Sequence, residues 1–376
     1  MTETAEILFT DEQAQLMDIA ESFSASKSPV DAVRRQIEAE GAIEADIWQE
    51  MAALGWLGIA IPEEYGGSGL GLGEVVAIVE PMGRNLLSSP LAATTLAARA
   101  ILQGGDDGQK SHWLPQLAGG TVAALALTEA HGDWDLTNLT CTAAASRDAL
   151  TLSGGKTFVT DAAMAEVFLV SVALDGAPAL LLVEAASLPA GALRREIVID
   201  ETRRSYSLNL DGIEVPKANL LPVDGAAACL KSLHLTACLF YAAEMCGGMA
   251  GVINVTLEYL LTRRQFDHFI GAYQALKHPM VDALVGMEQA RSHLYHAATV
   301  FDGPDGAAAE IAVRMAKAQA ADAFAFASDR AIQFHGAFGF TYDCDAQLYR
   351  RRALWCEQQH GDGAHHRKHL AGLLLD

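Results

Sequence analysis

The chain has 376 residues, of which 51% are hydrophobic and 19% are charged, so it is long and apolar enough for several folded domains and is not intrinsically disordered. Its formal net charge of −21 argues against general binding to nucleic acid or to anionic membranes, because both would repel the chain.

The first residues lack the basic start and apolar run of a signal peptide, and no uncharged apolar stretch reaches the roughly 18 residues that span a bilayer. The six cysteines are scattered without a Cys-x-x-Cys pair, which favours reduced thiols buried as small apolar groups. We therefore expect a cytoplasmic protein with no membrane and no nucleic-acid partner.

Residues 1–120 are predicted to form an N-terminal helical domain. Thr10 and Gln13 have the spacing of a capping box, in which a hydroxyl and an amide each satisfy a free N–H at the start of a helix. Four apolar residues follow at helical spacing and predict one buried face: Leu16, Ile19, Ala20 and Phe23.

Residues 121–225 are predicted to form a central β-domain. Short strand-like runs such as "EVFLVSVAL" and "PALLLVEA" are separated by turn signals, for example Asp175-Gly176 and Asp211-Gly212. Several short strands in about a hundred residues are typical of an antiparallel barrel or sandwich.

Residues 226–376 are predicted to form a C-terminal four-helix bundle. Two long apolar segments read as continuous helices, one beginning near Leu233 and one that Gly336 terminates. The fold class is therefore α+β and multidomain, with a helical domain, a β-barrel or sandwich and a helical bundle in that order.

Five motifs occur along the chain in this order and at wide separations: "PEEYGGSGL" (62–70), "LTEAHGDWD" (127–135), "GKTFVTDAAMA" (155–165), "RRQFDHFIGAYQ" (263–274) and "QFHGAFGFT" (333–341). With these motifs and this domain order, the chain resembles the acyl-CoA dehydrogenases, a flavoprotein family, over essentially its whole length.

The resemblance implies FAD as cofactor and an acyl-CoA thioester as substrate. In this family a carboxylate removes a proton alpha to the thioester while a hydride passes to the flavin, and the cofactor carries the redox step. The resemblance also implies oligomers in which one subunit donates groups to its neighbour's FAD, and an electron acceptor such as an electron-transfer flavoprotein.

The resemblance places cofactor-binding residues in two groups. The β-domain residues expected to line the flavin ring are Leu127, Thr128, Phe158 and Thr160. The residues expected to contact the neighbouring subunit's FAD are Arg263, Phe266, Gln274, Gln333 and Gly336, while Gly361 matches the glycine after the catalytic base. A guanidinium suits a pyrophosphate, and a glycine lets backbone N–H groups approach phosphates.

Several positions depart from the family pattern. His131, Asp133 and Trp134 replace small residues expected beside the flavin and the thioester. Elsewhere Asp267 and Ala337 replace glycines, and Asp362 stands where a threonine is usual, which predicts a negative charge near the FAD phosphates.

The largest departure is His360, which falls at the position of the family's catalytic glutamate. Some members carry the base on the first long helix of the bundle instead, but that position is near Ala237, and Glu244 lies about two turns further along. An imidazole can abstract a proton at neutral pH, so a catalytic His360 is one reading. A metal site from His360, His365, His366 and His369 has no supporting zinc pattern, and we expect no metal.

Three hypotheses follow. The first is a subunit without its own working base in a hetero-oligomeric acyl-CoA dehydrogenase, resembling bacterial enzymes for steroid side-chain acyl-CoAs, in which His360 is not functional and the FAD is shared with a homologous partner subunit. The second is a self-sufficient homotetramer that uses His360 or another base. The third is a binding or scaffold protein that keeps the fold without redox chemistry.

Overall fold

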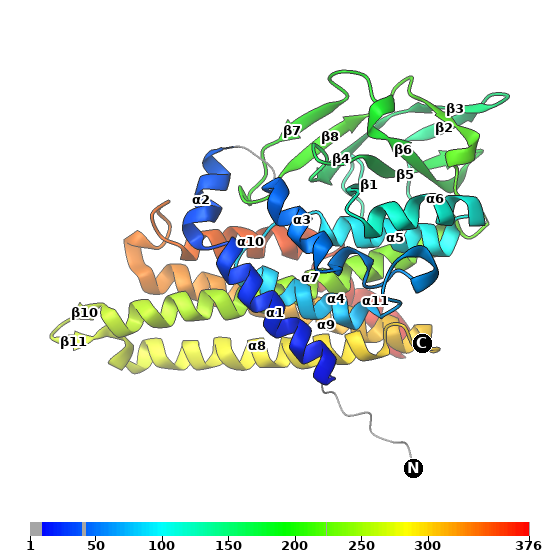
Figure 1. Ribbon diagram of the computed structural model, residues 1–376. Coiled ribbons are helices and arrows are strands. Elements are labelled where there is room, and N and C mark those ends of the chain that lie inside the picture. The colour runs from blue at the N-terminus through cyan, green and yellow to red at the C-terminus, as the bar shows by residue number, and fades with distance from the viewer. Residues whose placement is uncertain (1–9, 40–42, 223, 376) are drawn as a thin grey trace, which may run out of the picture. The chain divides into compact units, whose positions relative to one another are not determined.

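The computed structural model describes residues 10–39, 43–222 and 224–375 (Figure 1). The chain forms two compact units. The first unit contains the described residues of 1–38, 72–87 and 238–376, and the second contains those of 39–71 and 88–237. The domain boundaries drawn from the sequence at residues 120 and 225 stay predictions.

The fold class predicted from the sequence is confirmed, with helices first, a β-sheet region in the middle and helices again at the end. The N-terminal helices are α1 (Asp11–Lys27), α2 (Val30–Glu38), α3 (Ala45–Ala53), α4 (Leu72–Arg84), α5 (Leu91–Gly104) and α6 (Asp107–Ala118). The C-terminal helices are α7 (Ala226–Thr262), α8 (Gln274–Val300), α9 (Gly306–His335), α10 (Ala346–Gln358) and α11 (Gly363–Leu375). A small hairpin, β10 (Arg264–Gln265) and β11 (His268–Phe269), joins α7 to α8.

Local sequence signals set several of these ends. Thr10 and Gln13 form the predicted capping box of α1, and α9 ends at Gly336 as predicted. The predicted apolar face of α1 is wrong at one position, because Ala20 and Phe23 are buried whereas Ile19 is 49% exposed. Helical spacing identifies a stripe of apolar residues but not how far the packed surface extends across it.

The first unit is helical, and α9 is its central element. Helix α9 packs against α8, α10 and α11, while α4 packs against α1 and α8 (Figure 1). Helices α4 and α7 cross closely through two glycines. A Cβ at Gly247 would overlap the carbonyl oxygen of Glu80, and a Cβ at Gly83 would overlap that of Glu244.

Helix α7 is long and apolar enough to cross a membrane by length and composition, but 89% of its most apolar window is buried within the protein. Core helices of soluble proteins have the same property. None of the six cysteines forms a disulfide, and all six are buried, as the sequence predicts.

The second unit contains two sheets. The larger is formed by β1 (Ala123–Ala126), β2 (Thr142–Ala145), β3 (Ala149–Ser153), β5 (Val167–Leu174), β6 (Ala177–Glu184) and β9 (Glu214–Pro216). The smaller is formed by β4 (Gly155–Thr160), β8 (Ser205–Asn209) and β7 (Leu193–Glu196). The β5–β6 hairpin turns at Asp175-Gly176, where both residues have positive φ, as a two-residue turn of this composition requires.

The pairing is antiparallel except along one edge of β5. There β1 and β2 pair with β5 in parallel, one after the other, so the chain leaves the sheet at residue 127 and returns at residue 141. The sequence predicted an antiparallel domain. Strand-like composition does not reveal which distant strands pair, so the parallel pairing could not be predicted. The segment between β1 and β2 is a loop, and it carries the motif "LTEAHGDWD" (127–135).

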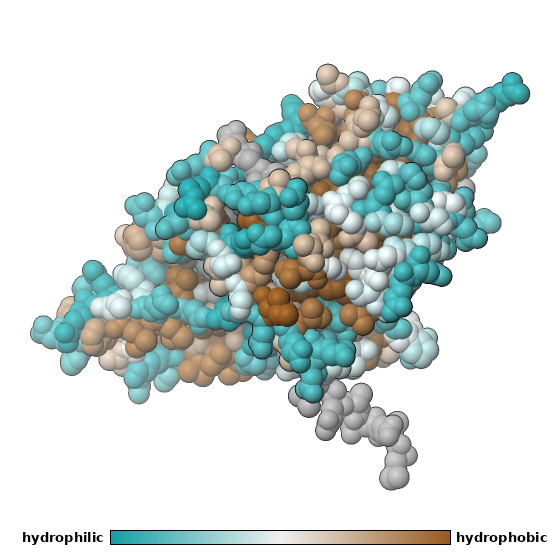
Figure 2. Space-filling model, in the orientation of Figure 1, coloured by the Kyte–Doolittle hydropathy of each residue, from teal (hydrophilic) through white to brown (hydrophobic). Residues whose placement is uncertain are grey.

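Exposed apolar side chains gather on α7 and α8 near the β10–β11 hairpin, where Figure 2 shows brown surface. They are Leu257, Leu261, Val281, Leu284 and Val285, each at least 40% exposed. Exposed apolar side chains that gather on one surface are typical of a protein contact surface.

The close crossing of α4 and α7 generates a stability prediction. Gly247→Ala should destabilise the protein by about 1–3 kcal/mol, because the added methyl group overlaps backbone that cannot rotate away. The control Gly306→Ala, at the exposed start of α9 with open space around its Cα, should be neutral or stabilising by about 0.5–1 kcal/mol. Urea unfolding of both variants checks this, and equal effects of the two substitutions would contradict the packing argument.

Candidate active site

The loop of residues 127–141 is anchored by one buried carboxylate, Glu129. Its oxygens accept hydrogen bonds from the backbone N–H of Thr140 at 2.8 Å and of Cys141 at 3.1 Å, and from the Thr140 hydroxyl. Lys156 Nζ lies 2.8 Å from Glu129 Oε1, and both side chains are almost fully buried. Burial alone would raise the pKa of Glu129, but the hydrogen bonds from Lys156 and Thr140 and the Lys156 charge lower it to about 2. An ionised carboxylate therefore ties the two ends of the loop together.

A β-bulge lies on β4 in the same unit. The pairing of β4 with β8 shifts register between Lys156 and Val159, and Phe158 adopts a φ of 54°. Glu196 holds this conformation by accepting hydrogen bonds from the Thr157 hydroxyl at 2.7 Å and the Phe158 N–H at 3.0 Å. Bulges re-aim side chains and are common beside active sites. Here the bulge leaves Phe158 43% exposed.

The four residues expected to line a flavin all lie around this bulge and the end of β1. The backbone N–H of Thr157 donates to the Thr128 carbonyl at 2.9 Å, which brings Thr128 beside Phe158. Thr128 and Thr160 are half-buried, whereas Leu127 is buried. The unit therefore presents hydroxyl and phenyl groups together, while their contact with a flavin stays a prediction.

The residues that replace the family's small loop residues form an ordered, exposed segment. The backbone N–H of Asp133 donates to His131 Nδ1 at 3.1 Å, and that of Asp135 donates to Asp133 Oδ1 at 2.9 Å. Asn138 adds a side-chain hydrogen bond to Asp133 at 2.8 Å. Trp134 is half-buried within this segment. His131 and Asp133 thus form hydrogen bonds within the loop itself.

In the first unit, a buried lysine holds the turn that carries His360. Lys317 on α9 is fully buried, and its Nζ donates to the carbonyl oxygens of Cys356 at 3.0 Å, Glu357 at 3.1 Å and Gly361 at 2.9 Å. The last carbonyls of α10 have no hydrogen-bond donor within the helix, and Lys317 donates to two of them. An amino group with three donors satisfied by three carbonyls fixes the backbone on both sides of residue 360.

His360 itself adopts a left-handed backbone conformation, with φ of 55°, and its ring is half-buried. Cys238 Sγ on α7 lies 3.5 Å from the His360 carbonyl, and the Tyr241 ring is 5.9 Å from the imidazole, between centroids. Burial, with a smaller contribution from the Lys317 charge, lowers the pKa of His360 to about 4. The side chain at the position where the resemblance predicts a base is therefore a neutral imidazole at neutral pH.

Asp362 has a structural partner in this turn. Its carboxylate accepts a hydrogen bond from the His365 backbone N–H at 2.7 Å, as a cap at the start of α11 does. The predicted effect of this negative charge on FAD phosphates stays a prediction, and the carboxylate has a structural role as a helix cap. Gly361 has φ of 103°, and a Cβ there would collide with the ring of His365.

The alternative base position on α7 offers no carboxylate. Ala237 is buried, and Glu244 forms an ion pair with the fully buried Arg352, 2.5 Å from Oε1 to Nη1. The Glu244 carboxylate is therefore engaged in a structural ion pair. Among the described residues, no group of three or more His, Cys, Asp and Glu side chains is placed to hold a metal ion.

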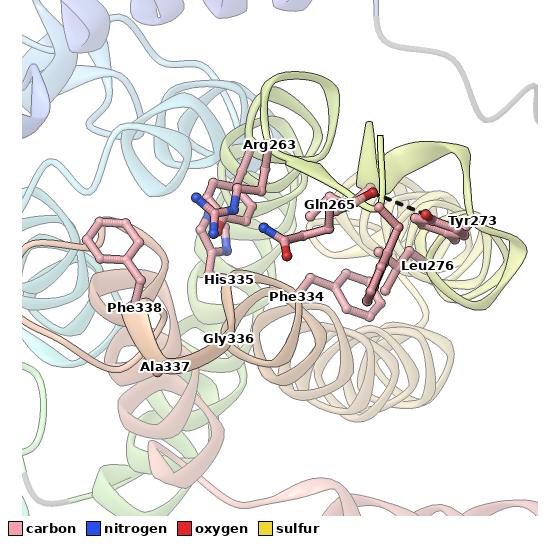
Figure 3. Close-up of a pocket in the computed structure, with 12 residues that line it drawn as sticks. Arg263, Gln265, Tyr273, Leu276, Phe334, His335, Gly336, Ala337 and Phe338 are labelled. Carbon is pink, nitrogen blue, oxygen red and sulfur yellow. Dashed lines mark hydrogen bonds between the residues drawn. The ribbon is translucent and has the colours of Figure 1, made fainter. Parts of the chain in front are cut away.

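A cavity of about 820 Å³ opens between the end of α7, the following hairpin and the end of α9 (Figure 3). Arg263 and Gln265 bring a guanidinium and an amide to it, and Gly336 begins the turn after α9. Its other lining residues are mostly aromatic or apolar: Tyr259, Phe266, Ile270, Tyr273, Leu276, Phe334, His335, Ala337 and Phe338. The cavity thus combines cationic and polar donors with aromatic walls.

This cavity brings together three of the five residues that the resemblance assigned to a neighbour's FAD: Arg263, Phe266 and Gly336. Gln274 and Gln333 are exposed outside the described lining, and their role stays a prediction. Sequence reasoning missed Gln265, Tyr259 and His335. Gln265 and His335 lie inside the quoted motifs, but nothing in a motif shows which of its side chains face one cavity.

Comparison with known proteins agrees with this arrangement. The model of the acyl-CoA dehydrogenase N-terminal domain matches residues 10–121, and that of the acyl-CoA dehydrogenase C-terminal domain matches residues 224–374. This chain belongs to the acyl-CoA dehydrogenase family. It is 30% identical over 309 residues to acyl-CoA dehydrogenase FadE12 of Mycobacterium tuberculosis, covering 79% of each chain.

Two solved structures share the fold along nearly the whole chain. The Tcur3481-Tcur3483 steroid ACAD, solved as a variant, is 27% identical with a TM-score of 0.86, covering 97% of this chain and 98% of that chain. A chain of the ChsE4-ChsE5 complex of Mycobacterium tuberculosis is 24% identical with a TM-score of 0.88, covering 99% of each chain. The second likeness shows the fold alone.

Members of the family are FAD flavoproteins, and the cavity residues fit such a group. Arg263 supplies a cation for phosphate oxygens, and Gln265 supplies an amide donor. Gly336 has φ of 63°, lines the cavity and has no atom within 4 Å of the position of a Cβ, so a side chain there would project into open space. The backbone at this turn can therefore approach a ligand closely.

The cavity predicts a specific effect on cofactor retention. Arg263→Ala should weaken FAD retention by the assembled protein about 10- to 100-fold without unfolding it, because a charge-assisted hydrogen bond to phosphate is lost. The neighbouring Arg264→Ala is a matched control, because the Arg264 guanidinium lies over the Phe269 ring at 4.5 Å and is not part of the cavity lining. Bound flavin per chain after desalting checks both variants, and equal losses would count against Arg263.

The anchored loop predicts a second effect, on stability. Glu129→Gln should destabilise the protein by about 3–5 kcal/mol, because it leaves the buried Lys156 without its charge partner. The double variant Glu129→Gln with Lys156→Met should lose less than the single variant, as chemical unfolding would measure. Because the folded pKa of Glu129 is below the unfolded value, its stabilisation is present at neutral pH and is lost as pH falls toward 2.

Proposed function

We propose that this chain is a subunit of a hetero-oligomeric acyl-CoA dehydrogenase that lacks its own working catalytic base. The observation that carries the proposal is the neutral His360 at the base position, with a pKa of about 4. Glu244, about two turns along α7 from the alternative base position, forms an ion pair with Arg352. Proton abstraction alpha to a thioester would then depend on the carboxylate of a homologous partner.

The basicity of His360 argues against a direct replacement of glutamate. A general base works best when its pKa lies near the operating pH, and this imidazole lies about three units below neutrality. The fixed turn leaves little freedom for the ring to reach a wetter position, because Lys317 and Cys238 hold the backbone around it. A homotetramer that uses His360 is therefore the weaker alternative.

The cavity lined by Arg263, Gln265 and Gly336 supports a role for this chain in binding a partner subunit's cofactor. Arg263, Gln265 and Gly336 would hold the phosphate-bearing part of a partner subunit's FAD, which when bound accepts the hydride from the substrate. The exposed apolar patch on α7 and α8 supplies a surface for subunit contact. Two different chains named together in the Tcur3481-Tcur3483 steroid ACAD, at 27% identity, support a heteromeric assembly.

The same likeness supports an acyl-CoA carrying a steroid as the substrate class. In this role the chain would bind and orient cofactor phosphates, and a partner would abstract the proton. A soluble electron acceptor such as an electron-transfer flavoprotein would reoxidise the complex. A binding or scaffold protein without redox chemistry is the remaining alternative, and flavin bound to this chain's complexes would argue against it.

The test is removal of the imidazole in the co-expressed complex. His360→Ala should leave turnover within about twofold of the unchanged complex, because a general base typically contributes about 100- to 10,000-fold and His360 is not that base. Turnover, FAD per chain and assembly state are measured together. A loss of more than about a hundredfold with FAD content and assembly unchanged would make His360 the base.

The second part of this test uses the chain alone. Purified without a partner, it should show negligible acyl-CoA dehydrogenation, and His360→Glu should not restore activity, because the 131–138 loop and the Asp362 cap also differ from the family pattern. Robust activity of the isolated chain would contradict the proposed function.

A further inference from the structure

The loop of residues 131–138 begins with a histidine whose two ring nitrogens have different partners. The His131 Nδ1 accepts a hydrogen bond from the Asp133 backbone N–H at 3.1 Å. A backbone N–H can only donate, so Nδ1 carries no hydrogen, and in the neutral ring the hydrogen is on Nε2. Nε2 lies 3.5 Å from Oε2 of Glu129, the buried carboxylate that anchors the loop. This conformation of the loop therefore requires one tautomer of a neutral imidazole.

Protonation of the His131 ring affects these two contacts differently. Nε2 carries a hydrogen in both the neutral and the charged ring, so its contact with Glu129 persists. Nδ1 gains a hydrogen in the charged ring, and two donors then face each other at Nδ1 and the Asp133 N–H. An imidazole ordinarily changes charge between about pH 5 and pH 8. Acidification through this range therefore removes the Nδ1 contact and leaves the Asp133 N–H without that acceptor.

The other titratable groups around His131 do not change charge in the same way. The described contacts connect it to Glu129, Asp133, Asp135, Cys141 and Lys156. The pKa of Glu129 is about 2, because Lys156 and Thr140 donate to it, so this carboxylate stays ionised in mild acid. Burial raises the pKa of the Cys141 thiol to about 11, so the thiol stays neutral. The anchor of the loop is therefore the same at both ends of the imidazole range.

The contact between His131 and Asp133 is the first of a series of short-range hydrogen bonds along the loop. The Asp133 carboxylate accepts from the Asp135 N–H at 2.9 Å and from the Asn138 side chain at 2.8 Å. The Asp135 carboxylate accepts from the Thr137 N–H at 2.9 Å. In each case a side chain accepts from the N–H two residues further on, as in an Asx-turn. His131 differs from the two aspartates because protonation of its ring turns the acceptor into a donor.

We propose that His131 makes the loop of residues 131–138 pH-sensitive, because the neutral imidazole holds the turn at Asp133 and the protonated imidazole releases it. The turn is held above the imidazole range and is lost as pH falls through it. Glu129 binds the far end of the loop in both states, so the change is confined to the loop. Trp134 is half-buried in the released segment. The resemblance places this segment beside the flavin and the thioester, so the shape of that surface changes with pH.

Hydrogen exchange in the full-length protein tests this inference. Exchange of residues 130–141 is followed by mass spectrometry with fragmentation to single amides, at about pH 8 and about pH 5, and is corrected for intrinsic rates. We expect the Asp133 amide to lose about tenfold in protection at the lower pH, from one lost hydrogen bond. The Thr140 and Cys141 amides donate to Glu129 and should be equally protected at both pH values.

Two substitutions fix the loop in one state. His131→Asn places an acceptor oxygen at the position of Nδ1 and can form an Asx-turn with the Asp133 N–H at either pH, so protection should persist in acid. His131→Phe has no acceptor, and the Asp133 amide should exchange at rates within about twofold of each other at the two pH values.

The outcomes separate this role of His131 from other effects of acid. If His131→Asn keeps the tenfold difference between the two pH values, another group is responsible and the proposal is wrong. Equal protection of Asp133 at both pH values in the unchanged protein would overturn it, and so would a simultaneous loss of protection at Thr140 and Cys141. These measurements involve no turnover and no cofactor, so their result does not depend on the proposed function.

Discussion

The turn at residues 359–362 depends on one buried amino group. Lys317 reaches from α9 to three carbonyl oxygens, two at the end of α10 and one at Gly361, and all three of its donors are used. Without it the last carbonyls of α10 would be buried without partners, and the left-handed conformation of His360 would lose its support. The position of residue 360 is thus set by backbone contacts and not by the side chain at that position.

The second unit uses a lysine in a comparable way. Lys156 meets the carboxylate of Glu129, and together they close the loop of residues 127–141 at its base. In both units, therefore, a buried lysine fixes the backbone, and neighbouring residues can be substituted without moving it. This separation explains how the loop can carry His131 and Asp133, and the turn can carry His360, without loss of the fold.

Much of the fold could be predicted because it depends on local chemistry. The capping box at Thr10, the two-residue turn at Asp175-Gly176 and the end of α9 at Gly336 each follow from a few adjacent residues. The parallel pairing of β1 and β2 with β5 could not be predicted, because it joins segments that are distant in sequence. Burial of Ala20 beside an exposed Ile19 depends on tertiary packing in the same way.

The candidate site was predictable in position more than in chemistry. Motif order located Arg263, Gly336 and His360, but it could not show that His335 faces the same cavity as Arg263 or that Asp362 caps α11. Those facts depend on which side of a helix end a residue occupies after the chain has packed. The identity of one residue therefore says less about the chemistry of the site than the set of side chains that line the same cavity.

The resemblance places the family's catalytic glutamate at residue 360, and a histidine in place of a glutamate reverses the effect of burial on basicity. Burial disfavours the charged form of any group, so it raises the pKa of a carboxyl and lowers that of an imidazole. A dry site therefore makes a carboxylate a stronger base and an imidazole a weaker one, and burial is the main cause of the low pKa of His360. The Lys317 charge lowers the pKa further and is fixed by its role in the turn. The low pKa of His360 therefore supports the proposal that a partner's carboxylate, and not this imidazole, abstracts the proton.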